Sequence, residues 1–598
     1  MIALRRKYLK FLALSLLVVL FIFSCISCQS QVVRGNGINV ILMIGDGMGW
    51  EMARTAAVSN GYPMYASGKG EGLNFQKLEG YTLATTYGTI IQGIDGKFST
   101  GNSALNRSNP ITAKSSLLKD FVFNSTFHKE SFAPDGTKKS ENDGNLVGYD
   151  PALGGVNPWT GGSDRKYIKQ NYPDSAGTAT ALYTGVKTYN GAMGVDIYEQ
   201  RQSTILEQAT KLGKSTGLVT SVPISHATPG AAASFVNQRG KYDAPLPDLD
   251  NILQQTLTVF QPTVILGGGH PFDLGNATEF GGSYDWRYVT QSTYEELKSK
   301  PNDNSYGYKF IERGADAAKK LQETAKSIDP NRGDRLLGLY GARGQFGNLP
   351  VSTANGDYSS TGLGSISVFA SAVENNQVPQ IGKKVRPLIQ GETEEKFIER
   401  EINENPTLAD LTSAALNILG KDKDGFWLMV EGGDIDWAAH DDNIDNLIGA
   451  VNSFDKAVGK TIEWIQQNGG WEKNLLIVTA DHDHYLTLNE NFPELMAKFG
   501  AEDLTYKRHK PDAAGHFWGS DSKIKYGWGT HSNRLVPVYY QGASINLKKY
   551  EGKDITLVDN PPEGTTRNLS IPGVENAIDQ THIYQGMLEA INAPVSRN

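Results

Sequence analysis

Short apolar runs that end in glycine or an acidic residue recur along the chain. The run at 38–44 leads into Gly45-Asp46, the run at 426–430 leads into Glu431, and the run at 475–480 leads into Asp481. Uninterrupted runs of this kind are typical of parallel strands that are buried on both faces. Three more apolar runs predict further strands, at 216–222, 264–266 and 536–540.

Segments with helical periodicity separate these strands. We expect helices at 204–212, 315–328, 408–419, 443–467 and about 577–592, and a helix of small residues that ends near 237–239. Strands that alternate with helices predict an α/β fold with a doubly wound, mostly parallel central sheet flanked by helices. The weakly periodic stretches 62–170, 285–405 and 486–528 are predicted to be surface insertions, the last of them a polar loop.

The first 28 residues have the pattern of an export signal. Arg5, Arg6, Lys7 and Lys10 precede an apolar run at 11–23, which is short for a membrane span, although a short membrane anchor stays an alternative. The basic stretch also resembles a twin-arginine signal, so the sequence does not decide between the general and the twin-arginine export routes. Cys25 and Cys28, the only cysteines, lie near a lipoprotein-like cleavage box, and either is a candidate for a lipid anchor. We therefore expect a signal peptide at 1–28, a polar linker at 29–36 and one large domain at 37–598, exported to the periplasm or cell surface.

The charge balance excludes one class of partner. The whole chain carries a formal net charge of −8, and the four basic residues of the leader make the remainder more acidic still. A general nucleic-acid binder needs a basic face, so nucleic acid is not expected as a specific partner. Small phosphorylated molecules stay compatible with this charge, because a local metal cluster can override it.

Asp174-Ser175 precedes a run of small residues that ends near Gly185. The pair fits the start of a helix, where backbone N–H groups favour an anion. A serine hydroxyl is a weak nucleophile near neutral pH and needs a base or a metal ion to activate it. The pattern alone also fits an ordinary helix cap, so the chemistry of Ser175 depends on its surroundings.

Metal-binding side chains gather where the predicted strands end. The carboxyl ends of parallel strands meet at one edge of a sheet, so these side chains can meet in space. Asp436 and His440 are one helical turn apart and can share a face. Mixed carboxylate and imidazole ligands suit zinc, whereas oxygen donors such as Glu431 and Thr228 suit magnesium. Two zinc ions about 4 Å apart would form a two-metal site. The candidate ligands at the strand ends are Asp46, Glu431, Asp436, His440, Asp481, His482 and His531.

Taken together, the motifs resemble those of the classical metal-dependent alkaline phosphatases, within the alkaline phosphatase superfamily. They occur in the family's order between about 38 and 540, at 44–49, 174–181, 185–191, 226–229, 430–433, 479–482 and 530–531. The resemblance implies that 37–598 is the catalytic domain. It further implies hydrolysis of phosphate monoesters to alcohol and inorganic phosphate through a phosphoserine at Ser175.

The resemblance also implies roles for the metal ligands. One zinc would bind Asp436, His440 and His531, and a second would bind Asp46, Asp481 and His482 together with Ser175. Magnesium would bind Asp46, Thr228 and Glu431. Arg239 would clamp the phosphate and Asp174 would orient Arg239.

Two positions vary within the family. His226 stands where some bacterial members have Asp, and Trp437 stands where some have Lys. Imidazole at position 226 can draw zinc or another transition metal into the third site, so the identity of the third metal is open. The sequence does not decide whether the protein forms a homodimer.

Other functions fit part of this pattern. A diesterase or a sulfatase of the same superfamily would share the metal ligands, and a non-catalytic phosphate-binding protein would not need an activated serine. A sulfatase motif does not match, because Ser175 is followed by Ala-Gly-Thr-Ala. The other histidines are predicted to be surface or packing residues: His128, His270, His484, His509, His516 and His582.

Overall fold

The computed structural model describes residues 37–88, 91–92, 98–99, 148–155, 165, 167–169, 172–197, 199–243, 251–271, 284–343, 345, 347–356, 358, 391–543, 545–556 and 570–593. The predicted export signal at 1–28, the linker at 29–36 and His128 lie outside these residues. Among the described residues, no helix combines the length and the apolar character that a bilayer span requires.

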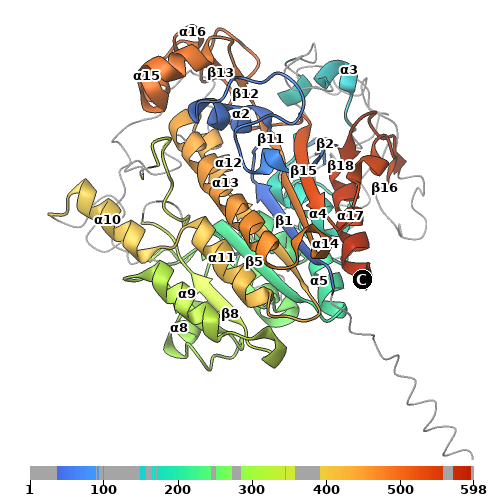
Figure 1. The fold of residues 1–598 in the computed structure, drawn as a ribbon, viewed down its shortest axis with the longest axis vertical. Helices are drawn as coiled ribbons and strands as arrows, with labels where there is room; N and C mark the ends of the chain where they lie inside the picture. Colours follow the sequence, from blue (N-terminus) through green and yellow to red (C-terminus); the bar gives the residue numbers. More distant parts are fainter. Residues whose placement is uncertain are drawn as a thin grey trace, which may run out of the picture.

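A ten-stranded sheet forms the centre of the described structure, in the order β18-β2-β15-β10-β1-β9-β5-β6-β8-β7 (Figure 1). The strands from β10 to β7 in this order run parallel, whereas β15 is antiparallel to both β10 and β2. The predicted doubly wound, mostly parallel α/β fold is therefore confirmed. The strands are β1 (Asn39–Gly45), β2 (Gly80–Thr85), β5 (Ser215–Pro223), β6 (Val264–Gly268), β7 (Lys309–Glu312), β8 (Leu336–Leu339), β9 (Phe426–Gly432), β10 (Asn474–Ala480), β15 (Val536–Gly542) and β18 (Ile578–Asp579).

Helices pack on both faces of this sheet. On one face, α11 and α13 pack against each other, α13 also contacts α2 and α12, and α11 also contacts α9; on the other, α4 packs against α17, α5 and α6. The central strands β1, β9 and β10 are almost completely buried between these layers, as their continuous apolar sequences predict. The larger helices are α2 (Trp50–Ser59), α4 (Ser175–Thr184), α5 (Ile205–Lys211), α6 (Ala227–Ala232), α8 (Gln291–Ser299), α9 (Ala317–Ser327), α10 (Glu394–Glu404), α11 (Leu408–Leu419), α12 (Asp434–His440), α13 (Ile444–Gln467), α15 (Phe492–Tyr506) and α17 (Gln580–Asn592).

Two predicted insertions contribute to the central sheet. The stretch 62–170 contains β2, which pairs with β15, and the stretch 285–405 contains β7 and β8 at the far edge of the sheet. The interpretation of both stretches as surface insertions alone is therefore wrong. These strands span only four to six residues each, too short to give a clear periodic signal.

The prediction of a polar loop at 486–528 is also wrong. This stretch forms α15, a short helix α16 (Pro511–Ala514) and an antiparallel pair of strands, β12 (Leu486–Leu488) with β13 (His516–Trp518). Phe492 and Met496 are buried in the first part of α15, and Leu504 is buried in the part that follows the break at Gly500. Figure 1 shows these elements together at the top of the molecule.

The helix of small residues is shorter than predicted. It ends at Ala232 instead of continuing to 237–239. Val236 lies beyond the end of the helix and exchanges two backbone hydrogen bonds with Met193, at 2.8 and 2.9 Å. Arg239 therefore lies in a loop beyond this pairing, where its N–H donates to the Gly191 carbonyl at 2.7 Å.

Candidate active site and metal centre

The register of the central strands brings acidic residues to one edge of the sheet. Gly45 lies opposite Ala480 of β10 and Gly432 of β9, so the segments that follow these strands lie side by side. The Gly47 N–H donates to Asp481 Oδ1 at 2.9 Å. Gly47 has a φ of +67°, and a Cβ at this position would lie 2.5 Å from the His484 ring. Glycine is therefore required here both by the backbone conformation and by the close approach of His484.

Helix α4 presents Ser175 to this edge. Asp174 caps the helix, with Oδ1 accepting hydrogen bonds from the Gly177 N–H at 2.9 Å and the Gly191 N–H at 3.0 Å. Ser175 is the first residue of the helix and is buried. The predicted helix start is confirmed, and the hydroxyl lies at the positive end of the helix dipole.

The Ser175 hydroxyl faces a carboxylate and an imidazole. Ser175 Oγ lies 3.3 Å from Asp46 Oδ2 and 3.2 Å from His482 Nε2. The same His482 nitrogen lies 3.3 Å from Asp46 Oδ1 and 3.4 Å from Asp481 Oδ2. The ligand atoms of Asp46, Asp481 and His482 all lie within 4.8 Å of one another. This group, together with Ser175 Oγ, has the donors and the spacing that a bound cation needs.

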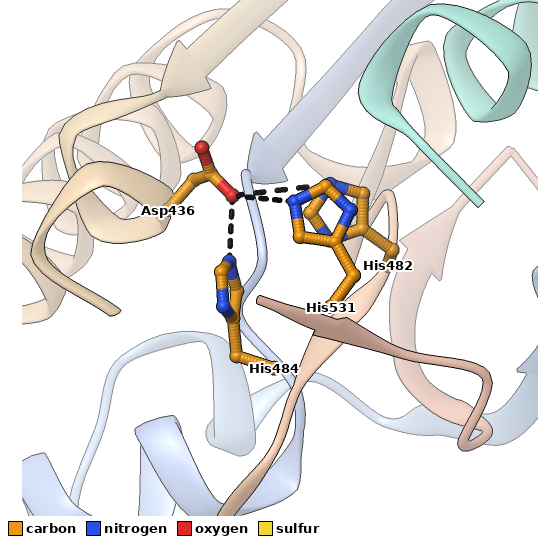
Figure 2. Close-up of side chains that lie close together, drawn as sticks. All are labelled: Asp436, His482, His484 and His531. Atoms are coloured by element: carbon orange, nitrogen blue, oxygen red, sulfur yellow. Dashed lines mark hydrogen bonds and ion pairs between the residues drawn. The ribbon is translucent and has the colours of Figure 1, made fainter. Parts of the chain in front are cut away.

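A second group surrounds Asp436 (Figure 2). Asp436 Oδ1 lies 2.6 Å from His484 Nε2, 3.2 Å from His531 Nε2 and 4.0 Å from His482 Nε2. His440 Nε2 lies 3.4 Å from the same oxygen and 3.0 Å from His531 Nε2. The ligand atoms of Asp436, His482, His484 and His531 fall within 4.8 Å of one another, and His482 belongs to this group as well as to the first. The second group therefore also has donors and spacing that suit a cation.

Backbone carbonyls orient two of these histidines. His440 Nδ1 lies 2.6 Å from the Gly529 carbonyl, and His531 Nδ1 lies 2.7 Å from the Pro173 carbonyl. A carbonyl can only accept, so Nδ1 carries the proton in both rings and Nε2 keeps its lone pair. This is the tautomer that a metal ligand requires, and it points both lone pairs at the region of Asp436.

Burial and crowding shift the pKa values of these groups strongly. Burial raises the pKa of Asp46 well above its usual range, and the neighbouring carboxylates Asp481 and Asp436 raise it further. Burial also raises the pKa of Asp481 to about 6. Burial lowers the pKa of His440 to about 3 and that of His482 well below its usual range. Although burial lowers it, the hydrogen bond with Asp436 raises the pKa of His531 above its usual value. Although burial raises it, the neighbouring His440 and His484 hold the pKa of Asp436 well below its usual range. The folded chain thus gathers carboxylates and imidazoles in a crowded, buried group that a cation would stabilise.

A set of oxygen donors lies beside the first group. Glu431 is fully buried, and one of its carboxylate oxygens accepts a hydrogen bond from Thr220. The other oxygen, Oε1, and the Thr228 hydroxyl are also buried. Burial raises the pKa of Glu431 to about 7, although the nearby Thr220 and Thr228 hydroxyls lower it. Buried oxygens gathered in this way fit a hard cation such as magnesium.

Arg239 contacts Asp174, the residue that precedes Ser175. Its Nη1 donates to Asp174 Oδ2 at 2.9 Å, and its Nη2 lies 3.3 Å from His226 Nε2. The Asp174 carboxylate therefore caps the helix that carries Ser175 and also holds Arg239. The His226 ring packs against Tyr242 and Trp437, with ring centroids 6.3 and 6.0 Å away.

Known proteins match this chain over much of its length. The family model described as alkaline phosphatase matches residues 148–346 and 371–559, more than half of the chain. The chain belongs to the alkaline phosphatase family. The *Escherichia coli* strain K12 alkaline phosphatase is 30% identical over 413 residues, which cover 64% of this chain and 76% of that protein. Alkaline phosphatase H of *Pseudomonas aeruginosa* is 32% identical over 323 residues, 52% of this chain and 57% of that protein.

A solved structure of an alkaline phosphatase also aligns with this chain. A cold-active alkaline phosphatase from *Shewanella* sp. aligns over 93% of this chain and all of that one, with a TM-score of 0.47 and 19% identity. Family membership itself rests on the sequence matches. It establishes that this alkaline phosphatase is an enzyme that hydrolyses phosphate monoesters and acts on small phosphorylated substrates.

The structure of this alkaline phosphatase gathers the sequence-predicted residues and adds one. The sequence predicts His484 to be a surface or packing residue; the side chain is buried, not on the surface, and it lies in the second group, whose ligand atoms could hold a metal ion. The short strand β11 (Asp483–His484) pairs with β14 (His531–Ser532) and places His484 opposite His531. The spacing of His482 and His484, two residues apart, was the available signal, because such residues share one face of an extended segment.

Proposed function

We propose that this enzyme hydrolyses phosphate monoesters in two steps through a phosphoserine at Ser175. The observation that carries the proposal is the position of Ser175 Oγ, at a helix start and 3.2–3.4 Å from Asp46 and His482. Ser175 Oγ would attack phosphorus, the bond to the substrate alcohol would break, and the phosphoryl group would remain on the serine. Water would then cleave the phosphoserine to give inorganic phosphate and free Ser175.

We propose that two zinc ions and one magnesium ion serve this site. One zinc would be held by Asp436, His440 and His531. The second would be held by Asp46, Asp481 and His482 with Ser175. Magnesium would be held by Asp46, Thr228 and Glu431. When bound, the metals would lower the pKa of the serine hydroxyl and stabilise charge on the attacking and leaving oxygens.

Within this scheme the protein residues bind and orient the phosphate. Arg239 offers a planar guanidinium whose two arms can donate to two phosphate oxygens. Asp174 supports this arrangement because its Oδ2 accepts from Arg239 Nη1 at 2.9 Å. Asp174 and Arg239 therefore fix the phosphate relative to the helix that presents Ser175.

Arg239 is expected to favour monoesters over diesters. A monoester has three non-bridging oxygens, enough for both arms of Arg239 and one more for the metals, whereas a diester has two and cannot fill all three positions. Arg239→Ala should lower kcat/KM for monoesters about 10- to 100-fold and should lower it much less for diesters, because a charge-assisted hydrogen bond contributes about 1.5–3 kcal/mol.

The test is a panel of monoester, diester and sulfate ester substrates assayed with wild type and Arg239→Ala. Arg332→Ala is the matched control, because Arg332 is exposed and pairs with Asp334. An unchanged ratio of monoester to diester activity in Arg239→Ala would remove Arg239 from the clamp. Faster turnover of diesters or sulfate esters than of monoesters by the wild type would contradict the proposal as a whole.

His484 is expected to support metal binding through Asp436. Its Nε2 lies 2.6 Å from Asp436 Oδ1, so it can donate to this carboxylate and hold it in place. Removal of such a supporting hydrogen bond typically lowers metal affinity about 10- to 100-fold. His484→Ala should therefore lose zinc at lower chelator concentration than wild type and should regain most activity in excess zinc.

Zinc content during a chelator titration measures this effect. His270→Ala serves as the control, because His270 is a largely buried histidine that pairs with Glu312 outside the site. Equal zinc retention in His484→Ala and wild type would show that His484 only packs against the site.

We also propose that the mature protein acts outside the cytoplasm. The basic start, the apolar run at 11–23 and the cysteines at 25 and 28 support export with a lipid anchor as an option. We also propose that the protein forms a homodimer, on the basis of the family relationship alone.

A further inference from the structure

A buried ion pair joins the chain around β11 to the chain around β14, and neither of its members belongs to the two groups of metal-binding side chains. Arg534 Nε donates to Asp483 Oδ2 at 2.8 Å, and the Ser532 hydroxyl donates to the same oxygen. Only 1% of Asp483 and 5% of Arg534 is exposed, so both charges are removed from water. Each charge therefore depends on the other for its stability in the fold.

The second arm of Arg534 binds the backbone of the β11 segment. Arg534 Nη2 donates to the His484 carbonyl at 2.8 Å and to the Leu486 carbonyl at 2.9 Å. The guanidinium thus reaches one carboxylate and two carbonyls of the same segment at once. Its planar fork suits this task, because the donors point in fixed directions.

Close packing also fixes the carboxylate of Asp483. A Cβ at Gly49 would lie 1.6 Å from Asp483 Oδ1, although the φ of −67° at Gly49 is open to any residue. Glycine is therefore required at position 49 by the approach of Asp483 and not by its own backbone conformation. Gly49 precedes helix α2, so the carboxylate lies at the helix end that favours negative charge.

Each half of the ion pair belongs to a segment that carries metal-binding histidines. Asp483 stands between His482 and His484, and Arg534 follows His531 by three residues. His484 lies opposite His531 in the pairing of β11 with β14, and the rings of His482 and His531 stack with centroids 3.6 Å apart. A shift of one segment along the other would displace ligands of both proposed zinc ions.

We infer that Asp483 and Arg534 are positioning residues, which fix the register of these two segments and thereby raise the affinity of the site for zinc. The inference rests on the proposed function, because it assumes that His482 and His531 bind zinc. Groups that orient metal ligands without touching the metal typically change the metal affinity about 10- to 100-fold.

The test removes both charges of the pair together. Asp483→Asn combined with Arg534→Met leaves neither charge buried without its partner, so this double variant is expected to fold. Glu401→Gln combined with Arg313→Met is the matched control. It removes another buried ion pair, with Arg313 Nη1 3.0 Å from Glu401 Oε2, between α10 and the residue after the outer strand β7.

The zinc content per chain is measured in a chelator titration, at a temperature well below the thermal midpoint of every variant. Under these conditions a less stable fold does not by itself change the zinc affinity of the folded state. The Kd for zinc should rise about 10- to 100-fold in the Asp483 and Arg534 double variant, and excess zinc should restore most of kcat. The control should keep the wild-type Kd even if its thermal midpoint falls.

A single variant keeps the test decisive if the double variant does not fold. Arg534→Lys keeps the positive charge beside Asp483 but replaces the planar fork by one ammonium group. It should also bind zinc more weakly than wild type, because it cannot reproduce the fixed directions of the three hydrogen bonds.

An unchanged Kd for zinc in the folded variants, or an equal rise in the control, would overturn the inference. His531→Ala separates this failure from failure of the proposed function, because it removes a proposed zinc ligand directly. If His531→Ala leaves the zinc content unchanged, the proposed ligand set is wrong. If His531→Ala loses zinc and the variants of the ion pair do not, the ligand set stands and the inference alone fails.

Discussion

Replacing Ser175 with alanine is expected to lower the turnover of phosphate monoesters at least about 10³-fold, because loss of a covalent nucleophile leaves only binding and electrostatic stabilisation. Ser175 Oγ is the side-chain hydroxyl that lies between Asp46 and His482, whereas Thr178 Oγ1 on the same helix lies 3.4 Å from Asp481 Oδ2. The zinc content should stay close to that of wild type, because carboxylates and imidazoles supply the other ligands.

The comparison uses steady-state rates and metal analysis on the same preparations. Ser413→Ala is the control, because Ser413 lies on helix α11 and donates to the Ala409 carbonyl away from the site. A Ser175→Ala enzyme that keeps its zinc and retains turnover within tenfold of wild type would show that Ser175 is not the nucleophile.

Removal of the metals is expected to abolish turnover and to destabilise the fold. Asp46, Asp436, Asp481 and Glu431 are all buried at one edge of the sheet, and their mutual repulsion contributes to the raised pKa of Asp46. A ligand that binds only the folded state contributes about 4 kcal/mol when its concentration is 1,000 times its Kd. Three ions at this level contribute about 12 kcal/mol together, so for a domain of this size we expect the thermal midpoint to drop by roughly 10 °C after the metals are removed.

Calorimetry before and after dialysis against a chelator measures this change. Addition of zinc and magnesium should restore both the midpoint and the activity, whereas magnesium alone should restore neither in full, because the two groups that contain imidazole prefer zinc. A metal-free enzyme with an unchanged midpoint would contradict the proposed role of these groups as metal ligands.

The centre of the fold could be predicted from the sequence because burial dictates it. The strands β1, β9 and β10 lie between two helical layers, so each contains a continuous run of apolar residues and leads into polar residues. Since the carboxyl ends of parallel strands share one edge, the acids that follow them could be expected to meet. Asp46, Asp436 and Asp481 do lie together in this way.

The periphery of the fold could not be predicted in the same way. The outer strands β2, β7 and β8 are short, and the helices and strands of 486–528 bury only part of their surface. Their patterns are weak in the sequence, because only a few positions in each must be apolar. These elements are defined by tertiary contacts that local patterns do not record.

Two features of the site depended on long-range contacts. His484 meets His531 because β11 pairs with β14, a pairing of residues far apart in the sequence. His226 meets Arg239 because the chain leaves helix α6 at Ala232 and returns toward Gly191. Residue types and spacing alone left both histidines without a defined partner.

The proposed reaction predicts one intermediate at one residue, and phosphopeptide mapping tests it most directly. Metal-loaded wild-type enzyme is mixed with a monoester, quenched in acid to trap the phosphoenzyme, digested, and examined by mass spectrometry. The account predicts a single phosphoryl group on Ser175, absent from the Ser175→Ala enzyme treated in the same way. A phosphoryl group trapped on any other residue, or none trapped while turnover proceeds and the quench is shown to preserve phosphoserine, would contradict it.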